Sequence, residues 1–145
     1  MKLDHTLQEL NALFLQQDIA QIEPFLLSRL ELASQGRDLA ARLTLLNELA
    51  SFYRNTIRFK ESISMAQRAL SLIEDMGYRN SMPYAGALMS LAATYAADTQ
   101  YSRALELYAQ VGSIYAAQHL AEGTLQQELA EKISATRHSA ALAQH

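Results

Sequence analysis

Two segments of the chain resemble each other at a fixed spacing of 42 residues. In each copy, leucines and one aromatic residue recur at intervals of three and four, the spacing of a single helix face. In the first helix of the copies the matched pairs are Leu46 with Leu88, Leu49 with Leu91, Ala50 with Ala92 and Tyr53 with Tyr95. In the second helix they are Phe59 with Tyr101, Ser62 with Ala104, Ile63 with Leu105 and Leu72 with Ile114. Because such a helix pair cannot bury its apolar side alone, each copy must stack on another.

The composition favours helices along the whole chain of 145 residues. Leucine and alanine dominate, valine occurs once, and no run alternates in the way of a half-buried strand. Breaks in the apolar pattern predict seven helices near residues 3–16, 20–34, 38–55, 59–76, 83–97, 101–118 and 122–141. With no Gly-rich or Pro-rich linker between them, these helices form a single domain over 1–145.

Particular residues mark the expected helix ends. Gly36 should close the second helix and Asp38 should cap the third, while Gly77 should end the fourth. Pro83 suits the first turn of the fifth helix, where a missing backbone N–H costs nothing. Pro24 lies inside the second predicted range, so that helix has an alternative start near residue 23.

The two copies resemble the tetratricopeptide repeat (TPR) family, whose W-x2-L-G-x2-Y pattern is followed by A-x3-F and a later alanine. The copies read Leu46-x2-Leu49-Ala50-x2-Tyr53 with Ser62, Ala66 and Ala69, and Leu88-x2-Leu91-Ala92-x2-Tyr95 with Ala104, Tyr108 and Val111. They depart from the family in having leucine for tryptophan, no closing proline, and a spacing of 42 rather than about 34 residues. Such long repeats are similar to those of kinesin light chains and of bacterial peptide-sensing regulators. A weaker first unit, Leu7-x2-Leu10-Asn11-x2-Phe14, extends the resemblance to about residues 3–118.

This resemblance implies an all-α fold: a right-handed α-solenoid of about three TPR-like hairpins plus a terminal helix. The units would cover about 3–36, 38–77 and 83–118, with the terminal helix at about 122–141. An apolar stripe of Leu125, Leu129 and Ile133 gives the last helix one side to pack. Two interpretations stay open for it: a cap over the last repeat, or the place where a longer array continues.

The sequence offers no chemistry for catalysis. A chain without cysteine has no disulfide, thiol nucleophile, thiolate zinc site or iron–sulfur cluster. Its four histidines lack the spacing of metal-ligand motifs, and neither a phosphate-binding glycine loop nor a nucleophile elbow is present. We therefore expect a non-enzymatic protein with no catalytic residues, no metal and no cofactor.

Charge and hydropathy limit the classes of partner that the chain is expected to bind. The net charge is −3, the pI is about 5.8, and Arg54, Arg58 and Lys60 are interleaved with acids, which disfavours nucleic acid. No apolar run approaches the roughly 18 residues that cross a bilayer, and an aspartate at position 4 is unlike a secretory signal. We expect a cytoplasmic protein that binds neither nucleic acid nor membrane.

The candidate binding residues flank the repeat signature on the first helix of each hairpin. In stacked repeats these helices line a concave surface, and the flanking positions point into it. Asn47 offers a donor and an acceptor to a peptide backbone, and Arg54 suits a carboxylate. The third unit offers a small, apolar surface with one adaptable methionine. The predicted peptide-binding residues are Thr44, Asn47, Ser51, Arg54, Asn55, Gly86, Met89 and Ala93.

These observations favour a protein–protein or peptide-binding module, either a scaffold or adaptor or the sensory part of a regulator, with its ligand in the concave groove. The alternative is a structural role: a self-associating solenoid that forms a homo-oligomer through its open ends, or the N-terminal part of a longer array.

Overall fold

The computed structural model describes residues 2–15, 19–120 and 123–144, and over these residues it contains seven helices and no strand. The helices are α1 (Leu3–Leu15), α2 (Ile19–Gln35), α3 (Leu39–Asn55), α4 (Phe59–Asp75), α5 (Met82–Ala97), α6 (Tyr101–Ala117) and α7 (Thr124–Ala143). The expected ends at residues 16 and 122 lie outside the described residues, and the other helix ends fall within two residues of their predicted positions. The all-α fold is therefore confirmed.

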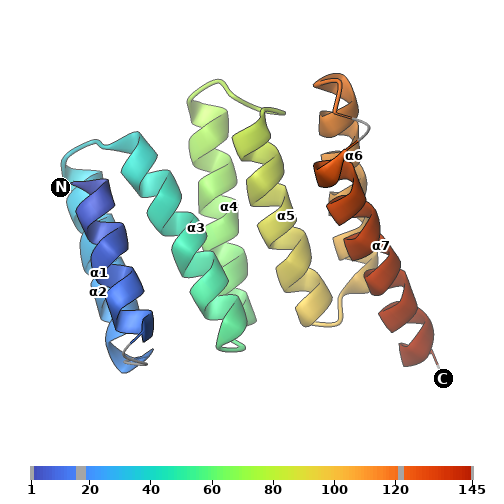
Figure 1. Ribbon diagram of the computed structural model, residues 1–145, viewed down its shortest axis with the longest axis horizontal. Coiled ribbons are helices and arrows are strands. Elements are labelled where there is room, and N and C mark those ends of the chain that lie inside the picture. The colour runs from blue at the N-terminus through green and yellow to red at the C-terminus, as the bar shows by residue number, and fades with distance from the viewer. Residues whose placement is uncertain (1, 16–18, 121–122, 145) are drawn as a thin grey trace.

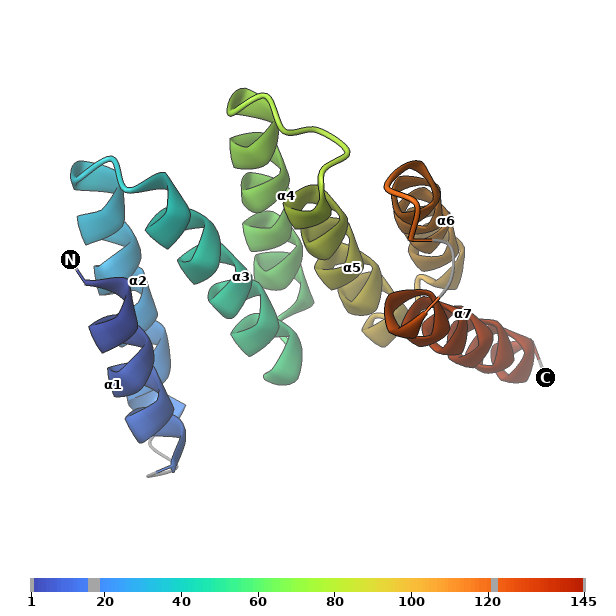
Figure 2. The ribbon, with the colours of Figure 1, turned by 45° about the horizontal axis from the view of Figure 1, so that its top comes forward.

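The helices form an open row in which each packs against the next in the chain (Figure 1). The odd-numbered helices α1, α3, α5 and α7 lie along one side of the row, and α2, α4 and α6 along the other (Figure 2). Beyond neighbours in sequence, α3 also packs against α5. Since α1 and α7 lie at opposite ends, the molecule is not a closed bundle.

The repeat in the sequence recurs in three dimensions. A shift of 42 residues places the end of α3 on the end of α5, and both ends of α4 on those of α6. All eight residues of the first-helix pairs are buried, from Leu46 with Leu88 to Tyr53 with Tyr95. Six residues (76–81) connect α4 to α5, whereas three connect α3 to α4, so the longer connection accounts for part of the long spacing.

Small residues allow the helices to cross closely. Ser62 of α4 and its counterpart Ala104 of α6 are both fully buried. The Ser62 hydroxyl donates to the backbone carbonyl of Ala50 at 2.7 Å and lies 2.8 Å from the Thr94 hydroxyl. This buried network joins α3, α4 and α5 into one packed unit.

Helix α2 passes through its proline. It begins at Ile19, so the alternative start near residue 23 is wrong. Proline removes one backbone hydrogen bond, to the carbonyl four residues earlier, and here that carbonyl belongs to the first turn of the helix. Ile22 is fully buried beside the exposed Pro24, and its packing holds the first turn in place. The predicted cap of α3 is confirmed, because the Asp38 carboxylate accepts the Ala41 N–H at 3.1 Å.

Most helices are followed by a residue in the left-handed backbone conformation, and in most cases this residue is not glycine. After α4 that residue is Gly77 as predicted, but after α2 it is Arg37 (φ 54°) rather than Gly36. The turns after α3 and α5 place Ile57 and Thr99 at the same φ of 63°. In each turn the following N–H bonds back five residues, as Arg58 does to the carbonyl of Tyr53 at 2.8 Å. This shared bond pattern, rather than the residue type, fixes the turn.

Replacing Ile57 with glycine is expected to raise the free energy of unfolding by about 1 kcal/mol. A β-branched residue is strained at positive φ, and the Ile57 side chain is 76% exposed, so little packing is lost. Thermal or urea unfolding measures the gain, and Gly77→Ala is the matched control, expected to lose a similar amount. Lower stability in Ile57→Gly would show that this side chain makes contacts that outweigh its strain.

Candidate functional site

The predicted binding residues lie on α3 and α5, neighbouring helices of the odd-numbered side. They do not all face the same neighbours. Ser51 and Asn55 line a cavity toward α1 and α2, whereas Arg54 reaches across to α5. The face expected on α3 therefore divides into two parts with different neighbours.

A cavity of about 210 Å³ lies where the end of α1 and the start of α2 meet α3. Both polar and apolar side chains line it, and the polar ones come from α3 and from Thr56, the residue that follows it. The lining residues are Phe14, Ile19, Ile22, Glu48, Ser51, Phe52, Asn55 and Thr56. We refer to it as the α1–α3 cavity.

Glu48 is the only titratable side chain that lines the described wall of this cavity. It is half-buried, and burial raises the pKa of its carboxyl above the ordinary value. Among the described residues no hydrogen bond or ion pair engages its carboxylate. The cavity thus combines apolar walls with a single carboxylate.

The Arg54 side chain forms hydrogen bonds within the protein. Its Nη1 donates to the carbonyl and to the hydroxyl of Ser90 on α5, both at 3.3 Å. The side chain is half-buried, and burial lowers the pKa of its guanidinium. This contact holds α3 against α5, so truncating Arg54 would alter the packing as well as any binding surface.

The other two predicted α3 residues are also constrained. The Thr44 hydroxyl donates to the carbonyl of Ala40 in its own helix at 3.0 Å. Asn47 is half-buried, and its Oδ1 is enclosed without a hydrogen-bond partner among the described residues. An enclosed oxygen of this kind is out of reach of a ligand unless a neighbouring side chain moves.

On α5 the predicted residues are two small ones, Gly86 and Ala93, and one methionine, Met89. Gly86 is exposed, and a Cβ added to it would meet no atom within 4 Å. Met89 is half-buried against the core, and Ala93 is half-buried one turn further along. This part of α5 offers a ligand close approach to the backbone.

Sequence reasoning missed the contribution of α1 and α2 to the α1–α3 cavity. Phe14 closes the weaker first unit, Leu7-x2-Leu10-Asn11-x2-Phe14, yet its side chain is 48% exposed. Ile19, just inside α2, is 57% exposed. Large apolar residues at a helix–helix turn were the available signal, but no local pattern shows that α3 passes beside them.

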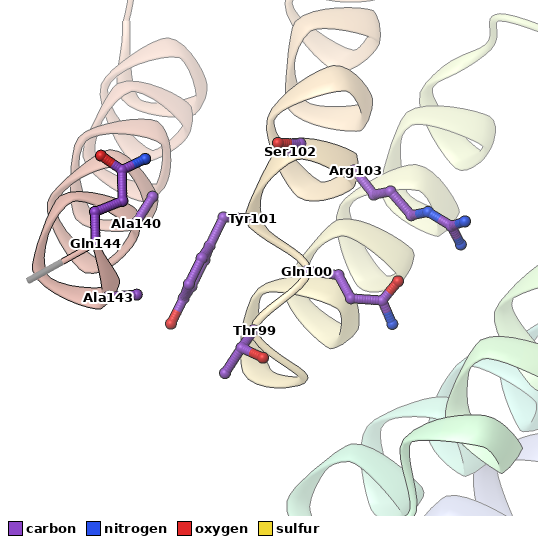
Figure 3. Close-up of a pocket in the computed structure, with 8 residues that line it drawn as sticks. All are labelled: Thr99, Gln100, Tyr101, Ser102, Arg103, Ala140, Ala143 and Gln144. Atoms are coloured by element: carbon purple, nitrogen blue, oxygen red, sulfur yellow. The ribbon is translucent and has the colours of Figure 1, made fainter.

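A second cavity, of about 450 Å³, lies between the start of α6 and the end of α7 (Figure 3). The Tyr101 ring lies between the two helices, while Gln100 and Arg103 lie on the other side of α6, toward α5. The Arg103 guanidinium stacks over the ring of Tyr95 at 5.6 Å. Since these polar groups do not converge on one point, this cavity presents no defined site.

Within residues 2–15, 19–120 and 123–144 no three metal-ligating side chains come together. In the same part of the chain, no helix has the length and apolar character needed to cross a membrane.

Comparisons with protein-family models, with curated proteins and with solved structures gave no significant match.

Proposed function

We propose that the chain is a non-catalytic protein- or peptide-binding module, a scaffold or adaptor or the sensory part of a regulator. In this proposal the row of helices is a right-handed, TPR-like α-solenoid whose ligand lies along the odd-numbered helices, in the cytoplasm. The observation that carries the proposal is the exposed side of α3 and α5. There the α1–α3 cavity, the polar residues of α3 and the open backbone at Gly86 follow one another along neighbouring helices.

This surface suits a peptide better than a substrate. The cavity of about 210 Å³ is smaller than the roughly 300–1,000 Å³ of ordinary small-molecule sites. It holds one or two side chains, and the remaining ligand would extend over α5. Ser51 and Asn55 supply a hydroxyl and an amide for hydrogen bonds to a ligand backbone.

A peptide array probed with the intact chain tests the proposal, and we expect it to identify segments that bind in the micromolar range or tighter. Sequence-independent weak signals across the array would contradict it, as would robust turnover of a metabolite.

Gly86→Ala is expected to stabilise the fold while weakening binding of an array-selected peptide several-fold. Alanine in a helix interior is favoured over glycine by roughly 0.5–1 kcal/mol, and the added methyl meets no atom of the protein. The same methyl would stand between α5 and a closely bound ligand. Melting temperature and peptide affinity are the two measurements.

Gly112→Ala is the matched control, since it also lies inside a helix and its new Cβ would make an ordinary contact, 3.6 Å from Leu129. It should gain similar stability and leave the affinity unchanged. Equal peptide affinities of the two variants would show that the ligand does not bind against α5.

Self-association through the ends of the row is the second candidate function. Leu27 and Leu32 of α2 are 41% and 44% exposed at the N-terminal end of the row. Burying leucine in an interface is favourable, so these side chains support a contact with a second copy. Sedimentation at increasing concentration separates the candidates, because a monomer at high concentration would exclude self-association.

A further inference from the structure

We propose that the α1–α3 cavity recognises a short protein segment in which an apolar residue stands beside a lysine or arginine. The apolar side chain enters the cavity and the cation pairs with Glu48. This inference rests on the proposed binding function and names the chemistry of the partner.

The walls of the cavity account for the apolar half of this motif. Phe14 and Ile19 remain 48% and 57% exposed, while Ile22 and Phe52 are buried behind them. Large apolar side chains left open around a concave site are typical of surfaces that a partner covers. The volume of about 210 Å³ suits one leucine or phenylalanine with room for its neighbour.

Glu48 accounts for the charged half. A half-buried carboxylate beside apolar walls is poorly solvated, so a cation brought next to it gains more than it would at an open surface. The two arginines that follow Glu48 have other partners: Arg54 donates to Ser90, and Arg58 pairs with Glu23 and lies near Glu61. The net charge of −3 also favours a basic partner over an acidic one.

Exposed apolar residues next to the α1–α3 cavity extend the apolar surface beyond it. Leu15 ends α1 with 77% of its surface exposed, and Ile57, the residue after Thr56, is 76% exposed. The ends of α1 and α3 face the same edge of the row (Figure 1). A segment of several residues, rather than a single side chain, can therefore lie across this edge.

Three fluorescein-labelled peptides of one length test the charge requirement: GSSLKFSSG, the same peptide with glutamate in place of lysine, and the same with norleucine. Fluorescence anisotropy with the intact chain should show the lysine peptide binding about 10-fold more tightly than the norleucine peptide. The glutamate peptide should bind most weakly. Equal affinity for the lysine and norleucine peptides would overturn the role of the cation.

Glu48→Gln keeps the size of the side chain and removes its charge. The variant should bind the lysine peptide about 5- to 10-fold more weakly than wild type does, and its affinity for the norleucine peptide should be unchanged. Glu106→Gln, an equal change of charge at an exposed position of α6, should alter neither affinity. A Glu48→Gln protein that binds the lysine peptide as wild type does would remove Glu48 from the site.

Phe14→Ala tests the apolar wall with small risk to folding, because the side chain is half exposed. The variant should bind the lysine and norleucine peptides more weakly, by the same factor. An unchanged melting curve would verify that it folds. Unchanged affinity for both peptides would place the ligand elsewhere. Array peptides that depend on Gly86 but not on Glu48 or Phe14 would overturn this inference and leave the proposed function intact.

Discussion

Replacing Tyr53 with alanine is expected to lower the free energy of unfolding by about 3–5 kcal/mol. The ring is 4% exposed between α2, α3 and the turn that follows α3. Its hydroxyl donates to Glu23 Oε1 at 2.9 Å, and the Arg58 guanidinium stacks over its face at 4.6 Å. Alanine would leave a cavity and remove both contacts, so chemical unfolding should show the full loss. A wild-type midpoint would show that the 42-residue register does not place this ring in the core.

The contribution of the Tyr53 hydroxyl to stability can be separated from that of the ring, and Tyr95 at the matching position of the repeat serves as the control. Tyr53→Phe should cost about 1–2 kcal/mol, because it removes one hydrogen bond to a carboxylate and leaves the packing intact. At the matching position, the Tyr95 hydroxyl makes no hydrogen bond to another described residue. Tyr95→Phe should therefore be nearly neutral, while Tyr95→Ala should still lose several kcal/mol.

The effect of Tyr53→Phe should also depend on pH. The hydrogen bond from Arg58 is the main cause that holds the pKa of the Glu23 carboxyl below its ordinary 4.5; the Tyr53 hydroxyl adds to this, and burial opposes it. A lowered folded-state pKa means that the ionised carboxylate contributes stability above about pH 4.5, which is lost as pH falls through the folded-state pKa. Burial and the same carboxylate raise the pKa of Tyr53 to about 12, so the phenol keeps its proton throughout. The stability difference should be constant near pH 7 and shrink in acid.

The helices could be predicted from the sequence because their signals are local. Leucines at intervals of three and four, a capping Asp38, and Pro83 in a first turn each act within one or two turns of helix. The repeat also predicted which residues would be buried, because Tyr53 and Tyr95 occupy matching positions in the two copies and both are buried. Arg37, which takes the left-handed position expected of a glycine, shows the limit: the bond pattern of the turn outweighed residue preference.

The candidate site was predicted less well because it depends on contacts between helices. Ser51 and Asn55 were identified as surface residues of α3, and they do line a cavity. The apolar wall opposite them comes from Phe14 and Ile19, more than 25 residues earlier in the chain, and no periodicity links the two. The bond from Arg54 to Ser90 was likewise hidden, since it requires α3 and α5 to lie side by side.

Leu129→Ala is expected to lower the free energy of unfolding of the last helices by about 2–4 kcal/mol. Leu129 is 1% exposed and lies over Gly112 of α6, and it is the one fully buried large apolar side chain in the described part of α7. Leu125, on the same helix, is 39% exposed, so Leu125→Ala should cost less than about 1 kcal/mol and serves as the control.

The place where this loss appears tests the architecture. In a stacked array each unit is stabilised by its neighbours, so damage at one end should stay near that end. Amide hydrogen exchange of Leu129→Ala should therefore accelerate in α7 and then in α6, while α2 and α3 keep wild-type protection. This expectation follows from the open row of helices, in which α7 and α1 lie far apart (Figure 1). An equal loss of protection in α2 would mean that the chain unfolds as one cooperative unit, and the solenoid interpretation would then have to be abandoned in favour of a single globular core.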